Sequence, residues 1–297
     1  MAECFYAELP ARGVLEVAGE DRVAFLQGLV TNDVTKVSSE CAIFAALLTA
    51  QGRYLFDFFI FALGDVLYLE TEGARIDDLK RRLGIYKLRS KVSLADASAR
   101  FVVAAGFGGQ AGETFGLTAL GAAKPFAGGI AYADPRLLEL GVRFALPRQQ
   151  DFGALDAAGF ARVEEARYDR HRLALGVPDG SRDLPVEKAL LLESGFDELN
   201  GIDWQKGCYM GQELTARTKY RALVKKRLLP VEIDGPLPAP GTPVMLGAEE
   251  VGEIHSGRDG RALALLRLEA VDAAEKGVAL TAAGARVKPE RPSWAKF

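Results

Sequence analysis

Three apolar segments of strand length, at residues 42–48, 54–61 and 65–70, follow one another in the first quarter of the 297-residue chain. Only short turns separate them, and the middle segment is rich in aromatic residues. Segments of this length and composition, bounded by turn residues such as those at 49–53, are typical of β-strands. Together they predict an antiparallel meander, so this part of the chain is expected to form a sheet.

Asp57 is the exception in this meander, because it is a carboxylate within an aromatic segment. A buried carboxylate needs a partner, or its pKa rises. Two interpretations therefore stay open. Asp57 either faces a ligand or is a solvated or structurally paired carboxylate.

The residues around the meander show both helical and strand periodicity. Helices are predicted from about residue 20 to 30, at 77–83 and at 159–175, and strands at 14–19, 101–105 and 141–147. From residue 227 onward the chain has short strands separated by proline- and glycine-rich turns, which indicates a small β-barrel. The expected fold class is α+β, with antiparallel sheets and helices, plus this C-terminal barrel. We expect a region of residues 1–222, with a subdomain break near 95–150, and a barrel domain of residues 223–297.

The octapeptide KGCYMGQE at residues 206–213 combines a cation, a thiol, an aromatic ring, two glycines, an amide and a carboxylate. Packing alone does not require that mixture. A glycine-hinged loop is predicted to run into a helix that begins near Gly211. The cation of Lys206 and the helix N-terminus would both lower the pKa of the Cys208 thiol and favour the reactive thiolate. A buried, unreactive cysteine stays the alternative, because burial is the commonest fate of this residue type.

This octapeptide resembles the signature Lys-Gly-Cys-(Tyr/Phe)-x-Gly-Gln-Glu of the YgfZ-type folate-binding proteins, and all seven specified positions match. These proteins are relatives of the glycine-cleavage T-protein, an aminomethyltransferase, and include mitochondrial iron–sulfur assembly factors of the same type. Similar motifs occur at residues 19–34 and, as Arg-Leu-x-Leu-Gly-x-Pro, at 172–178. The resemblance implies an aminomethyltransferase-like folate-binding fold with a C-terminal barrel.

The resemblance also implies tetrahydrofolate, or a one-carbon derivative of it, as the cofactor. Cys208 and Lys206 are the candidates for the chemistry. The candidates for folate binding are Asp57, Tyr168, Tyr209, Gln212, Glu213 and Arg217. For Tyr168 the alternative is a helix-face tyrosine in the core.

Arg217 begins a basic run that continues with Lys219, Arg221, Lys225, Lys226 and Arg227. The run is either a solvated linker or an anion site for the glutamate tail of folate or for a partner surface.

Three functions remain in consideration. The first is a tetrahydrofolate-binding accessory protein for iron–sulfur cluster assembly or repair, with Cys208 as the functional thiol and assembly proteins or client enzymes as partners. The second is an aminomethyltransferase; it is disfavoured because the Asp-Asp pair of T-proteins is here Phe56-Asp57. The third is a binding module linked to tRNA through the basic run. Whether the chain is an enzyme stays open.

Composition argues against several other classes. The net charge of −3 gives no reason to expect nucleic-acid binding. The glycine-rich segment at 106–112 lacks the spacing of a nucleotide-binding loop, and neither H-E-x-x-H nor G-x-S-x-G occurs.

The cysteines bear on the compartment, because Cys4, Cys41 and Cys208 are far apart and odd in number. This pattern argues against a disulfide framework and for a reducing compartment. Without a C-x-x-C pair, the chain alone is not expected to hold a metal cluster. No signal peptide pattern and no apolar run of transmembrane length are found. We therefore expect a cytoplasmic protein without a membrane partner.

Overall fold

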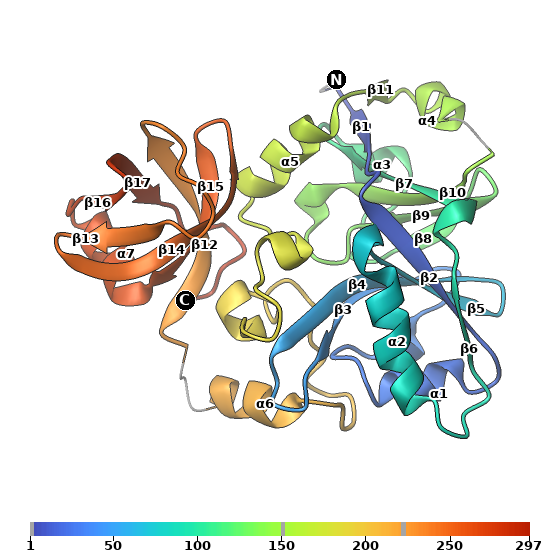
Figure 1. Cartoon of the computed structure of the whole chain (residues 1–297). Helices are drawn as coiled ribbons and strands as arrows, with labels where there is room; N and C mark the ends of the chain where they lie inside the picture. The colour runs from blue at the N-terminus through green and yellow to red at the C-terminus, as the bar shows by residue number, and fades with distance from the viewer. Residues whose placement is uncertain (1–2, 150–151, 221–223) are drawn as a thin grey trace. The chain divides into compact units, whose positions relative to one another are not determined.

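The computed structural model describes residues 3–149, 152–220 and 224–297 (Figure 1). It divides into two compact units, each assembled from segments far apart in the sequence. Unit 1 comprises Met1–Leu48, Leu55–Tyr168 and Leu199–Met210, and unit 2 comprises Thr49–Tyr54, Asp169–Glu198 and Gly211–Phe297. The predicted domain boundary at residues 222 and 223 lies outside the described residues and stays a prediction.

Unit 1 is built on two sheets. The six-stranded sheet has the order β11 (Ala161–Arg162), β1 (Phe5–Glu8), β7 (Phe101–Phe107), β10 (Val142–Pro147), β9 (Gly129–Ala133) and β8 (Ala123–Phe126). The five-stranded sheet has the order β3 (Ile43–Leu48), β4 (Tyr54–Leu63), β5 (Val66–Glu72), β2 (Arg12–Ala18) and β6 (Ser93–Asp96). In the first sheet the pair β1–β11 is parallel and the other pairs are antiparallel.

The predicted meander is confirmed as β3, β4 and β5. Strands β4 and β5 pair antiparallel, with Phe59 opposite Glu70 and Leu63 opposite Val66. Strand β3 is buried along its whole length and β4 up to Ala62, so both strands are covered on both faces. A continuous apolar segment, rather than an alternating one, is what such two-sided burial requires.

The helices are short and lie between the strands in the sequence. The α-helices of the described residues are α1 (Arg22–Gln27), α2 (Ile76–Tyr86), α3 (Ala111–Thr114), α4 (Gly153–Ala157), α5 (Glu165–Ala174), α6 (Gln212–Tyr220) and α7 (Leu268–Glu275). Single 3₁₀ turns are η1 (Val34–Lys36), η2 (Gly73–Arg75), η3 (Ser98–Arg100), η4 (Leu138–Leu140), η5 (Gly180–Arg182) and η6 (Leu191–Ser194).

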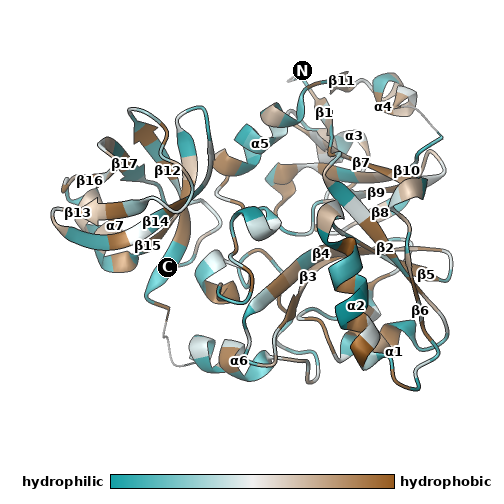
Figure 2. Ribbon diagram, viewed as in Figure 1, coloured by the Kyte–Doolittle hydropathy of each residue, from teal (hydrophilic) through white to brown (hydrophobic). Residues whose placement is uncertain are grey.

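Helix α2 buries Ile76, Leu79 and Leu83, which recur at helical spacing, against β2 and β6. Hydrophobic residues also occur at its C-terminal end, drawn in brown in Figure 2. The helix predicted at 159–175 begins later, at Glu165. Ala161 and Arg162 pair with β1 instead, so an inter-strand contact overrides the local helical pattern.

The C-terminal residues of unit 2 form a closed barrel, as the proline- and glycine-rich turns predict. Its strands, in order around the barrel, are β12 (Lys226–Asp234), β15 (Arg261–Arg267), β14 (Glu249–Arg258), β13 (Pro243–Leu246), β16 (Leu280–Ala282) and β17 (Ala285–Pro289). Closure removes the exposed sheet edges. Val271 of helix α7 is fully buried in the barrel core, together with Leu229 and Val231 of β12.

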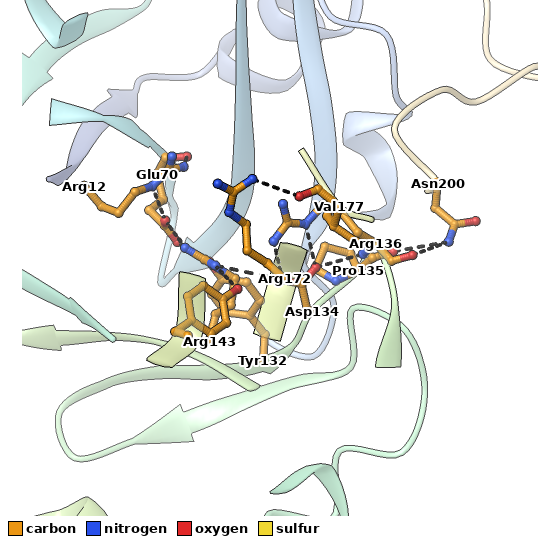
Figure 3. Close-up of polar contacts among 11 residues, drawn as sticks. Arg12, Glu70, Tyr132, Asp134, Pro135, Arg136, Arg143, Arg172, Val177 and Asn200 are labelled. Atoms are coloured by element: carbon orange, nitrogen blue, oxygen red, sulfur yellow. Dashed lines mark hydrogen bonds and ion pairs between the residues drawn. The ribbon is translucent and has the colours of Figure 1, made fainter. Parts of the chain in front are cut away.

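Glu70 of β5 is fully buried and joins the two sheets of unit 1 (Figure 3). Its Oε1 accepts hydrogen bonds from Arg12 Nε at 2.8 Å and from Arg143 Nη2 at 2.5 Å. Its Oε2 accepts from Tyr132 Oη at 2.7 Å. The guanidinium of Arg143 also lies 4.1 Å from the centre of the Phe59 ring. Burial raises the pKa of Glu70, but Arg143 and Arg12 more than offset it and bring the pKa down to about 2.

The variant Glu70→Gln is expected to remove the buried negative charge that Arg143 and Arg12 face and to lose several kcal/mol, on the order of 3, at neutral pH. Because the folded-state pKa lies below the ordinary value of 4.5, the stabilisation is present above pH 4.5 and is lost as the pH falls toward 2. Urea unfolding of wild type and variant between pH 7 and about pH 3 measures this difference, which should shrink with acidification. Glu232→Gln, which removes a half-exposed carboxylate 3.5 Å from Lys288, is the control. A pH-independent difference would contradict the assignment.

Candidate functional site

The segment Leu199–Met210 of unit 1 includes the first five residues of the octapeptide and contains no helix or strand. Hydrogen bonds attach it to the loop that follows α1. Lys206 Nζ donates to the carbonyl oxygens of Val30 at 2.5 Å and Asn32 at 2.8 Å. The backbone N–H of Met210 donates to Gly28 O at 3.1 Å. These bonds fix the backbone on both sides of Cys208.

Lys206 is half-buried in this arrangement, and burial lowers the pKa of its ammonium to about 8, against the opposing effect of Asp33 and Asp203. The ammonium lies 5.3 Å from the centre of the Tyr209 ring. Its donors are directed to backbone carbonyls, so the contacts of Lys206 are those of a positioning residue. Its predicted part in the chemistry is not tested by the structure and stays a prediction.

Cys208 is exposed, whereas Cys4 and Cys41 are partly buried. Burial raises the pKa of the Cys41 thiol, with Lys36 acting in the opposite direction. Cys208 is therefore not a buried cysteine, and its predicted reactivity stays a prediction. Among the described residues, no group of three or more His, Cys, Asp or Glu side chains is placed to hold a metal ion. From this part of the chain Cys208 offers a single thiolate ligand.

Helix α6 begins at Gln212, directly after Gly211, as the sequence predicts. Gly211 has a φ of +80°, a conformation that favours glycine. Glu213 and Arg217 pair across one helical turn at 2.5 Å, and both side chains are exposed. Gln212, Glu213 and Arg217 belong to unit 2, and their roles toward a ligand stay predictions. Arg221 of the basic run lies outside the described residues.

The turn between β3 and β4 packs against the start of α6. Gly52, at a φ of +74°, lies so close that a Cβ atom there would meet Gly211 O at 2.8 Å and Leu214 Cβ at 2.9 Å. Glycine at position 52 therefore serves both the turn conformation and the close approach to Gly211.

Asp57 of β4 and Tyr168 of α5 are buried in unit 1, with 4% and 7% of their surfaces exposed. The solvated interpretation of Asp57 is therefore wrong. The Tyr168 hydroxyl accepts from Arg143 Nη1 at 3.3 Å, and its ring centre lies 5.4 Å from that of Phe107. Tyr168 is packed as a core residue next to the Glu70 network, and its role toward folate stays a prediction.

The sequence analysis did not identify the charged residues that connect the buried Glu70 network of unit 1 to residues 199–210. Asp134 accepts two hydrogen bonds from the Arg136 guanidinium, at 3.0 and 2.8 Å, and lies 3.9 Å from Arg143 Nη1. The Asn200 amide donates to the carbonyls of Pro135 and Arg136, each at 3.3 Å (Figure 3). The available signal was a set of charged residues at the ends of apolar strands, where unpaired burial would be costly.

Unit 2 contains a cavity of about 130 Å³ that the sequence did not indicate. It is lined by Glu193, His255 and Glu253, together with apolar residues such as Leu228 and Leu265. His255 Nε2 is buried without a hydrogen-bond partner among the described residues, although Glu253 Oε1 lies 3.4 Å away. Burial raises the pKa of Glu193, against the opposing charges of Lys226 and Arg53.

Comparison with known proteins places the chain in a family. Residues 225–297, which include the barrel, match the family model of the CAF17 C-terminal beta-barrel domain. The chain is 34% identical over 290 residues to the mitochondrial iron–sulfur cluster assembly factor IBA57 of Mus musculus, which covers 90% of this chain and 78% of the mouse protein. The chain belongs to the IBA57 family of iron–sulfur cluster assembly factors. The human IBA57 protein is also 34% identical, with the same coverage.

A solved structure supports the fold of this IBA57-family chain. The glycine cleavage system aminomethyltransferase T from Bartonella henselae matches 99% of this chain and 86% of its own length with a TM-score of 0.79. At 14% identity this likeness concerns the fold alone. The predicted aminomethyltransferase-like fold is confirmed. The narrower prediction of a YgfZ-type protein is not confirmed, because the relatives are named as IBA57 factors.

The expected cytoplasmic location is contradicted, because the IBA57 proteins of mouse, human and Aspergillus fumigatus are named as mitochondrial. The cysteine pattern argues only against an oxidising compartment and does not distinguish one reducing compartment from another. None of the helices in the described ranges is long and apolar enough to cross a membrane.

The close approach of Gly52 to Gly211 can be tested with a matched pair of variants. Gly52→Ala and Gly64→Ala both place alanine at a positive φ, of +74° and +59°, but only position 52 has atoms within 4 Å of the added Cβ. We expect Gly52→Ala to lose roughly 1–3 kcal/mol more than Gly64→Ala, since the Gly211 carbonyl has to move. Urea unfolding measures the loss, and hydrogen exchange should show faster exchange in α6. Equal losses would show that this contact does not matter.

Proposed function

We propose that this protein supports iron–sulfur cluster assembly through the thiol of Cys208, with tetrahydrofolate as a bound cofactor. The observation that carries the proposal is an exposed thiol on a backbone held by the Lys206 and Met210 hydrogen bonds. A ligand on a fixed backbone loses little conformational entropy when it binds, so the anchoring favours use of the thiol.

The cluster, or a sulfur or iron intermediate of its assembly, is the substrate at Cys208. A thiolate is the preferred protein ligand of iron–sulfur clusters, which take four such ligands. Because Cys208 contributes one, the others come from a partner, either an iron–sulfur assembly protein or a client enzyme. The thiol therefore acts at the surface where that partner binds.

The variant Cys208→Ser is expected to fold normally and to fail in supporting cluster enzymes, since serine conserves the volume but not the thiolate. Activity of a cluster-dependent enzyme, in cells that lack the natural protein, should fall about tenfold or more. Cys41→Ser, at a partly buried thiol, is the matched control and should keep its activity. Full cellular function of Cys208→Ser would show that the Cys208 thiol is not needed for cluster assembly.

The proposal of tetrahydrofolate rests on the buried side chains of unit 1 that could contact its pterin ring. Asp57 is a buried carboxylate between Phe56 and Phe58, which are fully buried. Such a carboxylate fits the amide and amine donors of a pterin ring. Tyr168 and the half-buried Tyr209 are the further candidates in this unit. When bound, the cofactor would supply one-carbon chemistry, while Asp57 would orient its ring.

Titration of the purified protein with tetrahydrofolate under anaerobic conditions tests this part. Asp57→Asn is expected to weaken binding about tenfold, since a charge-assisted hydrogen bond is replaced by a neutral one. Asp65→Asn, at a fully exposed carboxylate, should bind as wild type does. Cys208→Ser should also retain binding. Absence of binding to wild type at millimolar tetrahydrofolate would contradict the folate proposal and leave the thiol proposal standing.

No specific observation favours the two other functions. The likeness to an aminomethyltransferase concerns the fold, and Phe56 stands where T-proteins carry the first member of their Asp-Asp pair. In the basic run, Arg217 pairs with Glu213 and Arg227 with Glu198, so these two cations are already engaged within unit 2.

A further inference from the structure

The C-terminal end of α2 and the turn after it carry large apolar side chains into solvent. Ile85 is 63% exposed, Tyr86 41% and Leu88 89%. The surrounding residues 79–91 contain six cations and no carboxylate, in a protein of net charge −3. We call Ile85, Tyr86, Lys87, Leu88 and Arg89 the basic apolar patch. Exposed apolar residues that adjoin one another are typical of interaction sites.

Several cations of this region lack an ion pair. Arg81 and Arg82 pair with Asp78, and Lys91 pairs with Glu20 at 2.7 Å. Within the described ranges, the side chains of Lys80, Lys87 and Arg89 form no such contact. The positive charge of the patch is therefore available to a partner.

Hydrogen bonds connect the turn that presents Leu88 to the rest of unit 1. Ser90 N donates to Lys87 O at 2.7 Å, and Lys91 N donates to Asp21 Oδ2 at 2.7 Å. Leu88 has a φ of +41°, a conformation unfavourable for a non-glycine residue. Burial of Leu88 within its own chain does not offset that cost, because the side chain is the most exposed large apolar one described. An open hollow lined by Asp21, Leu88, Arg89 and Ser90 adjoins it.

The patch and the Cys208 segment are attached to opposite ends of one short helix of unit 1. Asp21, directly before α1, accepts a hydrogen bond from the backbone N–H of Lys91. Gly28, directly after α1, accepts one from the backbone N–H of Met210. Six helical residues span only about 9 Å. A single folded partner is large enough to reach both features.

We propose that the basic apolar patch docks the protein that exchanges an iron–sulfur cluster or its intermediate at Cys208. This partner presents an apolar pocket, into which Leu88 inserts, with Asp and Glu side chains around it. The nature of the partner rests on the proposed function, while the docking surface does not. A lipid surface is disfavoured, because the one nearly fully exposed apolar side chain, that of Leu88, contributes little membrane affinity.

The test places a photo-crosslinking amino acid at position 88 of the full chain, in cells that lack the natural protein. Position 138 is the control, because Leu138 is another exposed leucine of unit 1, at 44%. We expect one dominant adduct at position 88, with a protein that contains iron when isolated and that crosslinks through an acidic segment. The double variant Lys87→Glu/Arg89→Glu should lower the adduct yield at least tenfold.

The crosslinked protein is then purified and titrated against wild type and Leu88→Ser. Its affinity should fall about tenfold or more with Leu88→Ser and should weaken with salt, as expected of charge complementarity. Equal adducts at positions 88 and 138, or a partner that carries neither iron nor transferable sulfur, would overturn the proposal. So would binding of wild type to phosphatidylcholine–phosphatidylglycerol vesicles that is lost with the double charge reversal, since this assigns the patch to a membrane.

The two proposals fail in distinguishable ways. Cys208→Ser should keep the adduct at position 88, because it removes the thiol and not the patch. If Cys208→Ser supports full cluster-enzyme activity while the adduct persists, the thiol proposal fails and docking stands. If the adduct is absent while Cys208→Ser abolishes activity, the docking proposal fails alone.

Discussion

The carboxylate of Glu70 is the constraint on which unit 1 depends. A fully buried charge is tolerated only when donors surround it, and here they come from both sheets: Arg12 of β2, Tyr132 of β9 and Arg143 of β10. The mutual position of the sheets is therefore fixed by hydrogen-bond geometry as well as by apolar packing. Through Asp134 and Arg136 the same network leads to the Asn200 amide, at the start of the segment that carries Cys208.

In unit 2, buried polar groups likewise join the barrel to the residues that precede it in the sequence. Arg172 of α5 donates to Asp183 Oδ2 at 2.6 Å and to Ser256 Oγ of β14 at 2.7 Å. The backbone N–H of Ser256 returns a bond to Asp183 Oδ1 at 3.0 Å. All three residues are buried, so within unit 2 the barrel is held to Arg172 and to the residue after η5, Asp183, by groups that cannot separate without losing their partners. The fold thus depends on buried arginine–carboxylate pairs at two places.

Local pattern predicted much of this fold. The meander, the barrel and the start of α6 after Gly211 follow from runs of residue types that lie next to one another in the sequence. The Glu70–Arg143 pair, separated by 73 positions, has no such signal, because any of several charged strand residues was an equally good partner. The Val30 and Asn32 carbonyls that bind the Lys206 ammonium have no local signal either, because they lie 176 and 174 positions away in the sequence. Two-residue β11 forms only because β1 is present, so its sequence alone was read as helix.

Anchoring by Lys206 and exposure of Cys208 belong together physically. A thiol on a mobile loop would reach many partners, but it would lose entropy on each binding event and would select none of them. A thiol on a fixed backbone presents one geometry to every partner. Discrimination between partners then requires a second contact surface at a set distance from the thiol. Helix α1 supplies that distance, since its two ends hold the Cys208 segment and the turn of Leu88. In the proposed arrangement a single cysteine is sufficient, because the chemistry resides in the thiol and the discrimination between partners resides in the patch.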